Sequence, residues 1–270
     1  MIADPAARPS VAYACHAVLT TSDPRAKLMA ARAAARDWQL GRLAHRFDAA
    51  MPDRPARPAA PELLPPHHMP RRGKGGSDRA RIAMLHALAH IEFVAIDLAF
   101  DLIGRFGADY PRAFVDDWMR VGADEAMHFA LLDRRLRHLG SHYGALPAHD
   151  GLWQAAEETA GDGDARLAIV PMVLEAGALD ITPSTIIRFE GAGDHSSAAM
   201  LRRIMADEIR HVRAGTTWFI WTANRRGLDP ANYYQILVKR HFRGGLKPPF
   251  NDSARHEAGL THDFYAALAT

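Results

Sequence analysis

Two pairs of short segments decide the fold of this chain: HIEFVAID (residues 90–97) with ADEAMH (123–128), and VLEAGALD (173–180) with ADEIRH (206–211). The first segment of each pair has a glutamate followed five residues later by an aspartate, and the second has Asp-Glu-x-x-His. Within each pair the glutamates are 33 residues apart, and the second pair repeats the first at an offset of 83 residues. Two unrelated segments that share one offset indicate a duplicated helix pair.

Helix-breaking residues lie midway between the two segments of each pair, at residues 107–111 and 191–193. A helix that runs about 15 residues past Glu92, turns, and returns by about 14 residues brings Glu125 back to the same height, at about 1.5 Å per residue. A glutamate and a histidine three positions apart on a helix point to one side. Each pair is therefore predicted to be a hairpin that brings two glutamates and one histidine together.

Packing two such hairpins would place four carboxylates and two imidazoles in one helical core. The carboxylates would repel one another and lose their hydration, whereas two divalent cations would neutralise them. One glutamate from each of two helices plus Glu-x-x-His from each of the other two is the ferritin-like di-iron or di-manganese pattern. A donor set without thiolate favours iron or manganese, with zinc as a substitute. The predicted metal ligands are Glu92, Glu125, His128, Glu175, Glu208 and His211. The alternative interpretation is surface Glu and His on ordinary helices.

The segments HALAHIE, ADEAMHFALL, LPAHDGLW, VLEAGALDITP and ADEIRHV carry a family resemblance that covers about residues 78–245. On these segments the chain resembles a bacterial ferritin-like family of unassigned function, domain of unknown function 455. It is more distantly similar to di-iron carboxylate oxygenases and tRNA hydroxylases. The resemblance implies that the six predicted residues are ligands, with Glu125 and Glu208, or their pseudo-symmetric mates, as bridges. It does not specify a substrate.

Aspartates precede two of the predicted ligands, at Asp124 and Asp207. A metal-bound imidazole usually donates its other N–H to a carboxylate, which makes these aspartates candidates for supporting the histidines. Similar di-iron proteins imply that such an aspartate reaches the histidine of the other hairpin. We therefore predict the pairs Asp207 with His128 and Asp124 with His211; the alternative is that both aspartates face solvent.

Other polar residues on the same helices are not expected to bind metal. Asp97 and Asp180 lie about 140° around the helix from their glutamates, so we assign them no ligand role. His86 and His90 share a helix face, but His90 lies about 160° from Glu92. The two histidines are therefore interpreted as core or interface residues.

The rest of the sequence predicts an all-α chain: a ferritin-like four-helix bundle with one long crossover, an N-terminal helix plus Pro-rich strap, and two C-terminal helices. Residues 23–47 predict the leading helix and the proline-rich residues 52–77 the strap. The other predicted helices are 78–106, 111–139, 151–160, 164–190, 195–226, 230–242 and 252–268. The predicted division is residues 1–77 packed on the bundle, residues 78–226 as the di-metal bundle, and residues 227–270 as a C-terminal helical extension.

Composition bounds the location and the partners. At 270 residues and 48% hydrophobic the chain has the composition of a soluble globular protein, and the single cysteine, Cys15, excludes an intramolecular disulfide framework. Without an uninterrupted apolar run of about 18 residues or an N-terminal apolar signal, we expect a cytoplasmic protein without membrane attachment. Residues 1–81 carry 14 Lys and Arg against 7 Asp and Glu. This basic front could contact phosphates, although a solvated helix face is the simpler interpretation.

The leading functional hypothesis is a non-haem di-metal oxidoreductase that uses O2 or peroxide on a small substrate. A tRNA-base hydroxylase is the second hypothesis, from the distant resemblance and the basic front. Metal binding without catalysis, such as iron handling, is the third. The expected partners are a small molecule and O2 or peroxide, with a homodimer compatible with the sequence. Pocket-lining residues on amphipathic helices look like other core residues, so the sequence does not identify the substrate.

Overall fold

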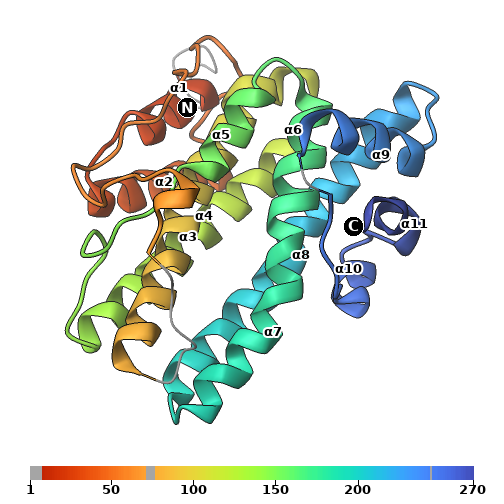
Figure 1. Ribbon diagram of the computed structural model, residues 1–270. Coiled ribbons are helices and arrows are strands. Elements are labelled where there is room, and N and C mark those ends of the chain that lie inside the picture. The colour runs from red at the N-terminus through yellow and green to blue at the C-terminus, as the bar shows by residue number, and fades with distance from the viewer. Residues whose placement is uncertain (1–7, 71–76, 244) are drawn as a thin grey trace. The chain divides into compact units, whose positions relative to one another are not determined.

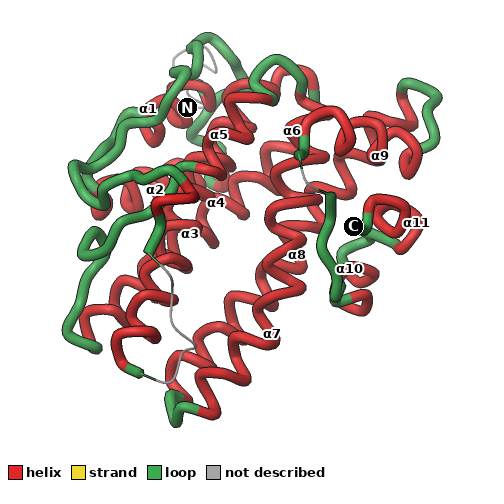
Figure 2. Tube along the Cα trace, viewed as in Figure 1, coloured by secondary structure: helices red, strands yellow, loops and turns green. Residues whose placement is uncertain are grey.

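The computed structural model describes residues 8–70, 77–243 and 245–270, and throughout these ranges the chain is helical without strands (Figure 2). The predicted all-α, ferritin-like class is confirmed at this level. The chain divides into two compact units, which are described separately. The first holds residues 8–70 and 78–151, and the second holds residues 152–243 and 245–270. Each unit contains one of the two predicted helix hairpins.

The first unit is built on the hairpin of α3 (Asp78–Phe106) and α4 (Arg112–His138), which pack along one another (Figure 1). A short 3-10 turn joins them, and both helices agree with their predicted bounds to within one residue. Gly122 allows the close approach of the two helices, because a Cβ atom there would lie only 2.6 Å from the ring of Phe100 on α3. This approach holds the two helices in a fixed register.

Among the described residues, two α-helices precede this hairpin. The first, α1 (Val11–Leu19), was not predicted; it starts where Ser10 accepts a hydrogen bond from the amide of Tyr13 and packs on α3. The second, α2 (Pro24–Gln39), packs on α4. Its predicted end at residue 47 is wrong, because Gly41 adopts a left-handed φ of 66° that terminates the helix. Cys15 of α1 is fully buried, and burial raises the pKa of its thiol.

The proline-rich strap packs against the first hairpin as an extended segment. A Cβ atom at Gly104 would lie 2.2 Å from the sulfur of Met51, so the residue that precedes the strap sits directly on the α3 backbone. Farther along, the Leu64 amide donates to the carbonyl of Ala148 at 2.8 Å, which pairs the strap with the segment after α4. The short 3-10 turn Pro66–His68 interrupts the predicted extended course, and residues 71–76 of the prediction lie outside the described part.

The second unit contains the hairpin of α7 (Ala176–Gly191) and α8 (His195–Arg225), which pack on one another. The helix predicted at 164–190 is one helical run of three parts, whose middle part is π-helical. The predicted helix 252–268 is wrong as a single element, because Gly259 has a left-handed φ of 77° between two short helices. The other described elements of this unit are α5 (Gly151–Glu158, whose first residue belongs to the first unit), α6 (Gly163–Ile169), the π-helical segment (Val170–Glu175), α9 (Pro230–His241), α10 (Asp252–Glu257), α11 (His262–Tyr265) and the 3-10 turn Ala266–Leu268.

Two helical stretches, Asp78–Asp109 and Gly163–Gly191, are long and apolar enough to cross a membrane by length and composition alone. Of their most apolar windows, 67% and 50% of the residues are buried in the structure. Core helices of a globular fold have the same composition. These stretches therefore act as core helices, and they do not indicate a membrane protein.

Candidate metal centre

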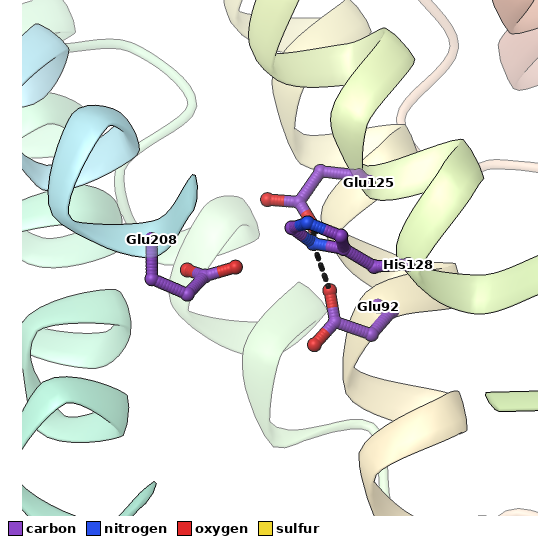
Figure 3. Close-up of side chains that lie close together, drawn as sticks. All are labelled: Glu92, Glu125, His128 and Glu208. Atoms are coloured by element: carbon purple, nitrogen blue, oxygen red, sulfur yellow. Dashed lines mark hydrogen bonds and ion pairs between the residues drawn. The ribbon is translucent and has the colours of Figure 1, made fainter. Parts of the chain in front are cut away.

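The first hairpin brings Glu92, Glu125 and His128 together in the core of its unit (Figure 3). His128 Nδ1 lies 3.2 Å from Glu92 Oε2 and 3.4 Å from Glu125 Oε2. One ligand atom from each of the three lies within 4.8 Å of the others. The exposed fractions are 6%, 1% and 0%, so two carboxylates and an imidazole meet away from bulk water. This buried cluster, the first half-site, could hold a metal ion.

The contacts within the first half-site fit a bound cation. Ligand atoms about 2.0–2.2 Å from an ion lie about 3 Å apart when they occupy neighbouring coordination positions. The two separations from His128 Nδ1 are close to that value. A cation held between the two carboxylates would offset the cost of burying their negative charge. The donor set of oxygen and nitrogen suits iron or manganese.

The second hairpin repeats the Glu-x-x-His part of this arrangement. Glu208 and His211 are three residues apart on α8, both are buried, and His211 Nδ1 lies 3.5 Å from Glu208 Oε1. The same imidazole nitrogen faces the same neighbour in both hairpins. Figure 3 also labels Glu208, on its own helix. We call Glu175, Glu208 and His211 the second half-site.

Glu175 differs from its counterpart Glu92. It ends the π-helical segment, and it is partly exposed where Glu92 is buried. Among the described residues of the second unit, no three acidic or histidine side chains place ligand atoms within 4.8 Å of one another. The structure therefore brings three predicted ligands together in the first unit and two in the second, and the ligand roles of all six remain predictions.

The two aspartates predicted to support the histidines have different surroundings. Asp207 is 1% exposed and accepts hydrogen bonds from two arginines of its own helix, Arg203 at 3.1 Å and Arg210 at 2.5 Å. Asp124 on α4 is half-buried. Their predicted pairing with the histidines remains a prediction.

Asp97, to which the sequence assigned no role, is the centre of a buried charge cluster. Lys27 of α2 and Arg57 of the strap both donate to its carboxylate, and the side chains of Lys27 and Asp97 are fully buried. Burial lowers the pKa of Lys27 and raises the pKa of Asp97. Lys27 Nζ and Arg57 Cζ also lie 5.4 and 5.6 Å from the ring centre of Phe93, which follows Glu92. Asp97 thus fastens α2 and the strap to α3 near the first half-site.

Asp180 has the corresponding role in the second unit. Arg255 of α10 makes a two-pronged contact with it, Nε to Oδ1 at 2.9 Å and Nη2 to Oδ2 at 2.6 Å. The backbone amide of Asn251 donates to Oδ1 at 2.8 Å. Sequence reasoning missed the three cations that bind the two aspartates, although the repeated Glu-to-Asp spacing had marked the aspartates themselves.

His86 and His90 are buried core residues, as predicted. His86 Nε2 accepts the amide of Gly144 at 2.9 Å, while His90 contacts the Tyr143 hydroxyl at 3.0 Å and the carbonyl of His149 at 3.2 Å. Burial lowers the pKa of each histidine to about 4. Their ring nitrogens are used to hold the segment that follows α4.

Comparisons with known proteins give one family match and one similar relative. The family described as "Protein of unknown function (DUF455)" matches residues 20–266. An uncharacterised protein of Haemophilus influenzae (strain ATCC 51907 / DSM 11121 / KW20 / Rd) is 39% identical over 212 residues, which cover 76% of this chain and 73% of that relative. No solved structure matches the chain significantly. With most of its length matched in both ways, the chain belongs to the DUF455 family of proteins of unknown function.

Proposed function

We propose that this protein binds two ions of iron or manganese, one at each half-site, and uses O2 or peroxide to oxidise a small organic substrate in the cytoplasm. The observation that carries the proposal is the buried contact of His128 with two carboxylates, together with the matching contact of His211 with Glu208. Buried carboxylates are stable when cations neutralise them. The repeat of one donor pattern on two hairpins supports one ion for each.

Each hairpin would supply the main ligands of its own ion. The first ion would be held by the first half-site, and the second ion by Glu175, Glu208 and His211. The spacing of imidazole from glutamate is nearly equal on the two helices, 3.4 Å on α4 and 3.5 Å on α8.

Two bound redox-active ions would supply the electrons that activate O2 or peroxide. The chain's own contribution is to position the ligands and exclude water. Phe93 and Phe129, the residues after Glu92 and His128, pack 5.2 Å apart between ring centres and are both buried. Their rings belong to the apolar core of the unit in which the first half-site is buried, and a charge attracts a cation more strongly where water is excluded.

The proposal is tested by counting metal in the purified chain after chelation and anaerobic reloading with Fe(II). The wild type should hold two ions, whereas Glu125→Gln and Glu208→Gln should each lose at least one. Glu190→Gln is the matched control, because Glu190 pairs with Arg202 on the surface of the second unit. Absence of bound metal in the wild type, or two ions in both site variants, would overturn the assignment.

The type of reaction is tested with the reduced, iron-loaded protein. Rapid mixing with O2 should give a transient absorbing species whose decay is faster in the presence of an oxidisable organic compound. Release of iron as ferric oxide would instead support iron handling, and salt-sensitive retention of tRNA would support the tRNA-base hydroxylase. Either result would replace small-molecule oxidation as the proposed activity.

A further inference from the structure

The helices that carry Glu92 and Glu175 differ in backbone geometry, although they are equivalent in the repeat. α3 is α-helical throughout, whereas Val170–Glu175 is π-helical. The Ala176 amide bonds the carbonyls of Pro171, five residues back, and Val173, three residues back. It therefore skips Met172, the carbonyl that an α-helix would use. The π-helical segment ends on a predicted metal ligand, and such segments occur frequently at functional sites.

A buried tyrosine takes up the carbonyl that the helix skips. The Tyr234 hydroxyl of α9 donates to the Met172 carbonyl at 3.0 Å, and Tyr234 is fully buried. Its ring makes edge contacts with Phe219 and Phe264, at 6.0 and 5.6 Å between ring centres. A buried carbonyl without a partner is costly, so this hydroxyl stabilises the π-helical geometry over the alternatives.

A glycine on α8 holds the other side of the segment. A Cβ atom at Gly215 would lie 2.4 Å from Pro171 Cβ and 2.5 Å from Pro171 Cγ, so only glycine lets the proline ring seat against the helix. Gly215 comes four residues after His211 and so shares its side of α8. Pro171 also lacks the amide that would continue an α-helical bond pattern. The π-helical segment is thus fixed between α8 and α9.

The orientation of Glu175 depends on this segment. One residue more or less per turn rotates the following side chains by about 100°. We infer that Tyr234 and Gly215 are positioning residues: through the π-helical segment they set the side of the helix from which Glu175 would reach the second metal ion. The inference rests on the proposed function. Because α3 has no π-helical segment, loss of this support should weaken the binding of the second ion and leave the binding of the first unchanged.

The test uses Mn(II) alone as the probe and counts bound and free ions by electron paramagnetic resonance. Tyr234→Phe should bind the first ion with wild-type affinity and the second at least about fivefold more weakly, since one buried hydrogen bond is lost. Tyr233→Phe is the matched control, because the neighbouring Tyr233 donates to Asp164 at 2.9 Å rather than to the π-helical segment. Gly215→Ala should also weaken the binding of the second ion alone, because its Cβ atom would displace Pro171.

A second measurement does not depend on metal. Amide hydrogen exchange of the apo-protein over residues 170–176 should be faster in Tyr234→Phe than in Tyr233→Phe, with unchanged far-UV circular dichroism. The inference would be overturned if Tyr234→Phe and Tyr233→Phe bound the second ion with equal affinity, or if Tyr234→Phe lost affinity for both ions equally. Either result would leave the proposed function in place. A wild type that binds neither Mn(II) nor Fe(II) would overturn both.

Discussion

Asp97 and Asp180 occupy equivalent positions, five residues after the first glutamate of each hairpin, and each binds a cation that comes from outside its hairpin. Lys27 and Arg57 arrive from the N-terminal side of the chain, and Arg255 from the C-terminal side. The duplicated aspartates therefore anchor the two segments that flank the duplicated region.

Asp97→Asn should destabilise the protein by about 3–5 kcal/mol, because Lys27 would remain buried without its counter-charge. Urea denaturation measures this loss. The double variant Lys27→Met, Asp97→Leu should be less destabilised than the single one, since the fully buried Lys27 charge is gone and the remaining cation, Arg57, is 18% exposed. As a control, Asp117→Asn on α4, part of a surface pair with Arg120 at 3.6 Å, should change the stability by about 1 kcal/mol or less.

Asp180→Asn should release α10 from α7 while the hairpin itself persists. With six residues, α10 is too short to stay helical without its tertiary contacts. Arg255 is 2% exposed in the folded protein. Limited trypsin digestion followed by mass spectrometry should show cleavage after Arg255 in the variant and not in the wild type. Equal protection in both proteins would contradict the anchoring role.

The sequence identified the hairpins and the acidic and histidine residues that they carry, because those signals are local and repeated. Breakers at 107–111 placed the ends of α3 and α4, and the spacing of Glu125 from His128 fixed their common side. What it did not reveal depends on residues that are distant in sequence. Lys27 and Asp97 are 70 positions apart, and no local pattern joins them.

Two features of backbone geometry were also invisible. The segment VPMVLE reads as ordinary helix, since its π-helical form depends on Tyr234 of α9 and Gly215 of α8. The helix α1 has nine residues and was missed because it is short and the N-terminal residues around it show no clear helical periodicity. Tertiary contacts, rather than propensity, determine both elements.

His86 should make the stability of the protein depend on pH. Its pKa is about 4 when folded, below the ordinary value of 6.5, because burial opposes its charged form. The stability that the neutral His86 contributes to the folded protein is therefore fully present above pH 6.5 and is lost as the pH falls toward 4. Between pH 7 and pH 5 the loss should approach about 2 kcal/mol.

The measurement is urea denaturation at the two pH values, with His86→Gln as comparison. Glutamine keeps an acceptor for the Gly144 amide but does not titrate. The variant should lose less stability than the wild type on acidification. An identical pH dependence in the two proteins would show that His86 does not contribute.

Removal of metal should lower the melting temperature, because an ion that binds only the folded state stabilises it by about 2.7 kcal/mol at 100 times its Kd. The shift between Fe(II)-loaded and chelated protein should shrink in His128→Gln. His138→Gln is the control on the same helix, since His138 is exposed and three turns nearer the end of α4. A full shift in His128→Gln would contradict its role as a ligand.

Because Cys15 is buried, the distance between labels placed on the two units can be measured without replacing it. Its thiol is fully covered within α1, and its raised pKa keeps it in the unreactive protonated form. A cysteine introduced at exposed Arg32 of the first unit and another at exposed Ile187 of the second would then be the only reactive thiols. Spin labels attached to them would report the spacing of the two units with and without metal, in a protein whose natural cysteine needs no replacement.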